Sequence, residues 1–155
     1  MKKSSKILLL IGGFLGIFLT LLWLSLTIVL FVGGGLMTAW ISGVDIGNAA
    51  RDWLQALAKS TGYNQSIYYS MEAFENHCYN QAACWLVMFF FAVPSTVISF
   101  ILHKKEKTGL PLPIVLAVIS TPCINIAAIV GAGLAIANWA VVERKEGQQP
   151  AEEKR

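Results

Sequence analysis

Three long stretches without a charged residue dominate the hydrophobic pattern of the chain. They cover residues 7–32, 84–102 and 114–142. A soluble core breaks its apolar residues into short periodic sets, whereas uncharged runs of about 20 residues suit the hydrocarbon interior of a bilayer. The pattern therefore predicts an all-α membrane protein, with three transmembrane helices in a single transmembrane domain over residues 1–142.

The first stretch is long enough to be a permanent membrane anchor. At about 1.5 Å per residue, a helix over residues 7–32 is roughly 39 Å long, against a bilayer core of roughly 30 Å, so it spans with some tilt. The alternative is a cleaved signal peptide, because three lysines precede the stretch. A signal core has only about 7–15 residues and is followed by an A-x-A-like site, which is missing here. We expect an uncleaved anchor, with a helix weakened at the glycines 33–35.

Proline interrupts the other two stretches. Pro94 lies in the middle of residues 84–102, where it removes one helical hydrogen bond and predicts a kink. Pro122 lies inside residues 114–142 and allows two interpretations. The stretch is either one kinked helix or a short re-entrant piece followed by a helix from about Pro122. Because it is too short for two full spans of about 20 residues each, we expect the single kinked helix.

The segment between the first two stretches, residues 41–83, carries polar residues in a helical pattern. Asp45 is a candidate N-cap and Gly62 a candidate stop. The apolar face of this predicted helix comprises Ile46, Ala50, Trp53, Leu54 and Leu57. A second short helix is expected after Ser66, with Ile67, Met71 and Phe74 on one side. The polar faces are poor in Lys and Arg, so we expect packing onto the protein's own spans rather than lipid insertion.

Basic residues set the expected orientation, because they tend to remain on the cytoplasmic side. The N-terminus and the loop at residues 103–107 each carry three lysines. Three spans put both regions on one side, so we expect a cytoplasmic N-terminus and an extracytoplasmic segment 41–83. The tryptophans Trp40, Trp85 and Trp139 would then mark the outer interface. The short, Lys-rich N-terminus resembles that of a bacterial inner (cytoplasmic) membrane protein.

The polar C-terminal tail, residues 143–155, mixes acidic and basic side chains with Gln and Pro and is expected to be disordered. Arg144 and Lys145 directly follow the third stretch, although three full spans would place them outside. A re-entrant first part of the third stretch would bring the tail to the inside.

Composition narrows the range of functions. Hydrophobic residues make up 55% of the chain and charged residues 14%, against about 25% charged in a soluble domain. The net charge of +3 comes without a broad basic face, so no nucleic-acid partner is expected. The three stretches lack the charged side chains that proton relays, coupled transporters and voltage sensors carry. We find no hydrolase, nucleotide-binding or metal-ligand pattern, and therefore expect no enzyme, no cofactor and no metal site.

Cys78 and Cys84 form a candidate disulfide, because both fall in the segment expected outside. The bond requires the chain to turn at residues 79–83, since a continuous helix would hold the two thiols too far apart. We favour a structural staple over a redox pair, because the C-x5-C spacing is wider than that of catalytic C-x-x-C pairs. Two unpaired thiols are the remaining alternative. Cys123, deep in the third stretch, is expected to be a packing residue.

Small and amide side chains mark candidate helix-packing positions. Small residues at four-residue spacing allow close approach of helices, and a buried amide in a membrane more often joins helices than lines a pathway. The candidate positions are Gly12, Gly16, Asn125, Ala127, Gly131 and Ala135. They predict association with other membrane proteins or with a second copy of the chain, in addition to membrane lipid.

These observations support three hypotheses of function. The first is a non-enzymatic accessory or structural subunit of a membrane complex of the conjugation, secretion or transport type. The second is a small oligomeric pore or a holin-like protein, with Pro94, Pro122 and Asn125 at the pore. The third is an extracytoplasmic thiol redox protein that uses Cys78 and Cys84.

Overall fold

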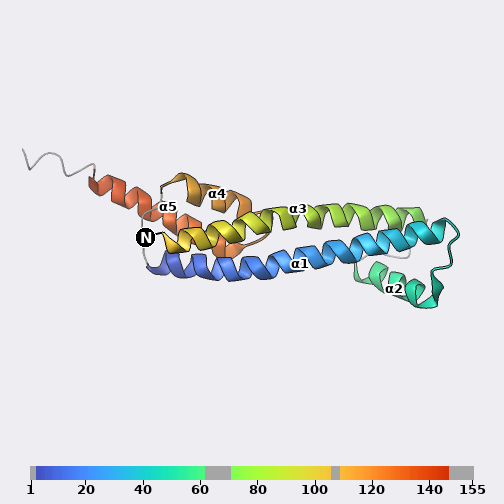
Figure 1. Cartoon of the computed structure of the whole chain (residues 1–155). Coiled ribbons are helices and arrows are strands. Elements are labelled where there is room, and N and C mark those ends of the chain that lie inside the picture. Colours follow the sequence, from blue (N-terminus) through green and yellow to red (C-terminus); the bar gives the residue numbers. More distant parts are fainter. Residues whose placement is uncertain (1–2, 62–70, 106–108, 147–155) are drawn as a thin grey trace, which may run out of the picture. The chain divides into compact units, whose positions relative to one another are not determined.

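The computed structural model describes residues 3–61, 71–105 and 109–146, and these are almost entirely helical. Five helices are found in the described residues (Figure 1). They are α1 (Lys3–Ile41), α2 (Gly47–Ser60), α3 (Met71–Lys104), α4 (Pro111–Ser120) and α5 (Ile126–Glu146). Three are long and apolar enough to cross a membrane, namely α1, α3 and residues Ile126–Arg144 of α5. The expected all-α membrane fold with three long apolar helices is confirmed.

Helix α1 continues through the three glycines that were expected to weaken it, and ends only at Ile41. Gly33 and Gly34 are buried. A Cβ atom added at Gly33 would lie 2.5 Å from Cδ2 of Leu57, and one added at Gly34 would lie 2.8 Å from the ring of Tyr79. These glycines therefore make room for neighbouring side chains within a continuous helix.

The chain divides into two compact units. Unit 1 comprises residues Met1–Leu21 and Met88–Arg155, and unit 2 comprises Leu22–Val87. Unit 1 thus holds the first turns of α1, the C-terminal part of α3, and all of α4 and α5. Unit 2 holds the rest of α1, the whole of α2 and the first turns of α3.

The core of unit 2 joins all three of its helices. It consists of Leu30, Met37, Leu54, Leu57, Phe74, Cys78 and Ala82. The amphipathic helix expected here is α2, whose buried residues are Leu54 and Leu57. Trp53, expected on the same face, is 37% exposed. The expected stop at Gly62 and the start after Ser66 lie outside the described residues.

A hydrogen bond and a salt bridge of Asp45 stabilise the first turn of α2. The carboxylate of Asp45 accepts hydrogen bonds from the Gly47 backbone N–H at 3.0 Å and from the Arg51 guanidinium at 3.2 Å. Arg51 also lies over the ring of Trp40 at the end of α1, 5.2 Å from the ring centre. Asp45 thus bonds to the first residue of α2, but the prediction that it is the N-cap is wrong, because Ile46 holds that position without a side-chain cap hydrogen bond. Arg51 links α2 to α1.

The single kinked helix expected over residues 114–142 is wrong, because the chain forms two helices there. Helix α4 ends at Ser120, a turn covers residues 121–125, and α5 begins at Ile126. Pro122 lacks the N–H that would continue α4. Ile124 takes a positive φ of 60°, which ends the helical path, and the Asn125 N–H closes the turn on the Ser120 carbonyl at 3.0 Å. Helices α4 and α5 lie side by side in unit 1 (Figure 1).

The tail also begins later than the sequence indicated. Helix α5 continues to Glu146, so residues 143–146 are helical and not disordered. Residues 147–155 lie outside the described part of the chain. Pro94 is inside α3, which runs without a break to Lys104.

Candidate functional site: a polar helix break in unit 1

The break between α4 and α5 lies deep in unit 1. With ten residues, α4 is about 15 Å long, half of a bilayer core of about 30 Å. Its last residue, Ser120, meets Ser95 of α3, with the two Oγ atoms 2.7 Å apart. Ser95 lies about 14 Å along α3 from Lys104. The break is therefore about half a membrane thickness from the basic end of α3.

Asn125 links the turn between α4 and α5 to α1. Its Nδ2 donates a hydrogen bond to the Gly12 carbonyl at 2.8 Å, and its Oδ1 accepts one from the Ala128 backbone N–H at 3.2 Å. The second bond is that of a helix N-cap, so one buried side chain both begins α5 and ties it to α1. Gly12 lies about 14 Å along α1 from Lys3, which gives the break the same depth as the Ser95 contact does.

The candidate glycines lie at close contacts between helices. A Cβ atom added at Gly12 would be 2.7 Å from the Ala128 backbone nitrogen, and one at Gly16 would be 2.3 Å from Oγ1 of Thr96. At Gly131 it would be 3.1 Å from the backbone nitrogen of Leu9. Ala135 is buried and Ala127 is partly buried. The three glycines thus lie at contacts between helices inside unit 1, and association with another membrane protein stays a prediction.

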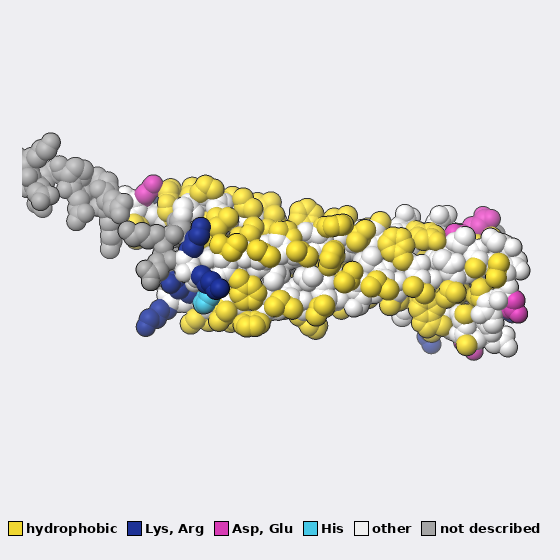
Figure 2. Space-filling view, in the orientation of Figure 1, with side chains coloured by type: hydrophobic (Ala, Val, Ile, Leu, Met, Phe, Trp, Pro, Cys, Tyr) yellow, Lys and Arg dark blue, Asp and Glu magenta, His cyan; other side chains and the backbone are white. Residues whose placement is uncertain are grey.

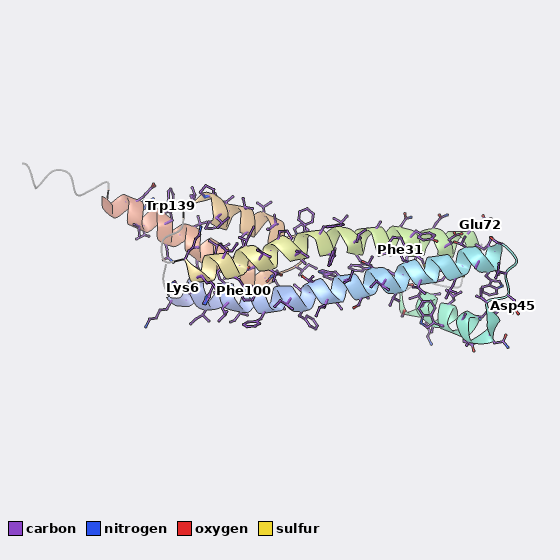
Figure 3. All side chains as sticks on the ribbon, in the orientation of Figure 1. Lys6, Phe31, Asp45, Glu72, Phe100 and Trp139 are labelled. Carbon is purple, nitrogen blue, oxygen red and sulfur yellow. The ribbon has the colours of Figure 1, made fainter. Side chains whose placement is uncertain are left out.

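Helix α5 returns along α1 towards the end where α1 begins. The hydroxyl of Ser5 donates to the Gly131 carbonyl at 3.0 Å, while Gly12 is bonded to Asn125, so the two helices are antiparallel. Trp139 consequently lies towards the end of unit 1 that carries Lys6 (Figure 3). The expectation that Trp139 marks the outer interface does not fit this arrangement.

The expected disulfide between Cys78 and Cys84 is not formed. Helix α3 runs without interruption through both residues, and both are free cysteines, Cys78 buried and Cys84 exposed. Six residues of helix separate them by about 9 Å along the axis, beyond the reach of about 7 Å between Cα atoms that a disulfide allows. The turn that a disulfide requires at residues 79–83 is absent. Cys78 and Cys84 therefore form neither a structural disulfide nor a redox-active pair in this structure.

The other polar side chains around the break bond within their own segments. Ser99 donates to the Ser95 carbonyl at 2.8 Å, and the Cys123 thiol donates to the Ser120 carbonyl at 3.4 Å. Asn125 was predicted from its sequence position, but the serine pair across α3 and α4 was not. Its only signal was the occurrence of small hydroxyl residues next to Pro94 and Pro122. Within the described ranges, no group of three or more His, Cys, Asp or Glu side chains is placed to hold a metal ion.

The chain matches no family model, no curated protein and no solved structure. The fold itself defines the class: an all-α protein whose three long apolar helices suit an integral membrane protein.

Proposed function

We propose that the chain is a non-enzymatic subunit of a membrane complex, an accessory or structural component of the conjugation, secretion or transport type. The observation that carries this proposal is the packing of α2 against the other two helices of unit 2, α1 and α3. Leu54 and Leu57 are buried against α1 and α3, and Arg51 lies over Trp40. A helix held in this way presents a fixed polar surface, as a docking element requires.

The outward surface of α2 is polar and only weakly charged. Its exposed side chains include Asn48, Asp52, Gln55 and Lys59. We place this surface on the extracytoplasmic side of a bacterial inner membrane. The basis is the clustering of lysines at the other end of the uncharged stretches, which favours a cytoplasmic N-terminus.

Unit 1 serves in this proposal as the membrane anchor. We propose that α4 and the first turns of α5 form a re-entrant hairpin that enters and leaves the membrane on the cytoplasmic side. This arrangement accounts for Arg144 and Lys145 directly after the last apolar stretch, because both would then lie in the cytoplasm with the other basic clusters.

Site-specific photo-crosslinking in cells tests the docking surface. A photoreactive amino acid is placed at Gln55 or Asp52 on α2, and at Phe18, which is 61% exposed on α1 of unit 1, as a matched control. We expect discrete protein adducts from both α2 positions and lipid adducts alone from Phe18. The proposal fails if neither α2 position captures a protein and the chain also runs as a monomer in mild detergent.

A further inference from the structure

One end of unit 1 carries a dense group of cations from three helices. Figure 2 shows Lys and Arg side chains gathered at the end of unit 1 where α1 begins. The described members of this basic patch are Lys3, Lys6, Lys104, Lys105 and Arg144. Glu143 is the one acidic side chain described in unit 1. The patch therefore carries a clear excess of positive charge.

Two of the helices that carry the patch are fixed to each other at this end. Nδ1 of His103 on α3 lies 2.9 Å from the carbonyl oxygen of Lys6 on α1. Because a carbonyl only accepts hydrogen bonds, Nδ1 carries the proton. The neighbouring bond from Ser5 to Gly131 ties α5 to the same end of α1. The hydrogen bond of His103 thus fixes the lysine-bearing ends of α1 and α3 to each other.

The cations of the patch have no carboxylate partner among the described side chains. The one ion pair found there joins Arg51 to Asp45, in unit 2. Closely placed cations without counter-charges repel each other, and binding of an anion relieves this repulsion. Lys3, Lys104 and Lys105 are exposed and Lys6 is partly exposed, so an anion can reach all four.

Apolar side chains beside the patch indicate which anion is suitable. Ile7 of α1 directly follows Lys6 and is 57% exposed, and Ile101 of α3 is 42% exposed, one turn before Lys104. Both isoleucines belong to helices that are long and apolar enough to cross a membrane. Exposed isoleucines beside the lysines match a ligand with acyl chains and a phosphate, and not a free phosphate ion.

We propose that the basic patch of unit 1 binds the headgroups of anionic phospholipids. The lysines contact the phosphates, while the exposed isoleucines Ile7 and Ile101 contact the upper acyl chains. Polybasic groups next to transmembrane helices attract anionic lipids in this way, and the attraction is screened by salt. This inference does not depend on the proposed partner at α2, because it involves other residues and another ligand.

Native mass spectrometry of the full chain in detergent tests the proposal. The delipidated protein is titrated with phosphatidylglycerol or with phosphatidylcholine of the same acyl chains, at low ionic strength. We expect the anionic lipid to be retained at least about tenfold more strongly, with the preference falling as salt is added. Equal retention of the two lipids would overturn the proposal.

Charge-removing variants locate the site. Lys104→Gln combined with Lys105→Gln changes only exposed side chains at the end of α3, and the addition of Lys3→Gln and Lys6→Gln removes the lysine part of the patch. The matched control, Lys59→Gln, removes an exposed cation from unit 2. We expect a stepwise loss of the preference in the first two variants and none in the control. An unchanged preference after the loss of all four lysines contradicts the site, as does displacement of the lipid by equimolar inorganic phosphate.

Discussion

Helices α1 and α5 pack closely together at Gly12. The backbone nitrogen and Cα of Ala128 would lie 2.7 and 2.9 Å from a Cβ atom at position 12. Backbone atoms cannot rotate out of the way as a side chain does, so any larger residue must push the helices apart. The same contact brings the Gly12 carbonyl within reach of Asn125.

Gly12→Ala should therefore destabilise the protein by about 1–3 kcal/mol, the usual cost of overpacking. Gly133→Ala is the matched control, because the structure shows nothing within 4 Å of an added Cβ there. Alanine is the better helix former, so this control should be neutral or slightly stabilising. Thermal unfolding in detergent measures both variants. Equal melting temperatures for the two variants would contradict the close contact.

The two hydrogen bonds of Asn125 can be separated by substitution. Asn125→Ala removes the cap of α5 and the bond to Gly12, and should cost about 1–2 kcal/mol. Serine can still cap a helix but does not reach the Gly12 carbonyl, so Asn125→Ser should fall between the wild type and Asn125→Ala. Thermal unfolding that ranks the serine variant with or below the alanine variant would show that capping contributes nothing.

Residue spacing indicated the small and amide positions but not their neighbours. Four-residue spacing shows that Gly12 and Gly16 share a helix face, but it does not show which helix covers that face. The sequence therefore predicted close helix packing at these glycines, and the structure shows that Ala128 and Thr96 of the same chain lie beside them. The disulfide expectation failed for a related reason: nothing in residues 79–83 ends a helix, and α3 continues through them.

At the scale of elements, α2 depends on two buried leucines for its position. Leu54 is 2% exposed, whereas Gln55 beside it is exposed. Leu54→Ala should cost about 2–5 kcal/mol of local stability, and Gln55→Ala almost nothing. Hydrogen exchange over residues 47–60 measures the local stability of α2, and we expect faster exchange in the leucine variant alone. Unchanged exchange in Leu54→Ala would mean that α2 is not held by this core.

The length of an uncharged stretch located α1 and α3 but not their ends, and it predicted the third stretch poorly. Helix α3 begins at Met71 instead of Cys84, so the separate short helix expected with Met71 and Phe74 is wrong: these residues form the first turn of α3. Pro122 allowed both a kink and a break, and the decision rests on local geometry that composition does not reveal. Ile124 adopts a positive φ although β-branched residues disfavour it, and Asn125 caps the following helix. The end of α4 is fixed by Ser95, a contact between residues 25 positions apart. Such long-range contacts decide the break, and a sequence window does not contain them.

At the scale of the whole molecule, the buried polar groups of unit 1 bear on the pore hypothesis. Asn125, which that hypothesis places at a pore, is fully buried and bonded to Gly12 and Ala128. We therefore expect liposomes that contain the purified chain at high density to retain an entrapped dye as well as protein-free liposomes do. Rapid leakage, abolished by Asn125→Ala, would restore the pore hypothesis.

The re-entrant hairpin is the central claim about the whole molecule, and cysteine accessibility tests it most directly. Single cysteines are introduced as Ser4→Cys and Glu143→Cys in a background where Cys78, Cys84 and Cys123 are alanine. Both positions are exposed, and Asp52→Cys on α2 reports on the other unit. A membrane-impermeant maleimide is applied to intact cells and to inverted membrane vesicles.

We predict that Ser4→Cys and Glu143→Cys react in inverted vesicles and not in intact cells, while Asp52→Cys does the reverse. Residues 4 and 143 then lie on one side of the membrane, as a hairpin that turns back at residues 121–125 requires. Reaction of Glu143→Cys in intact cells, with Ser4→Cys protected, would mean that α5 crosses the whole membrane and would contradict the account.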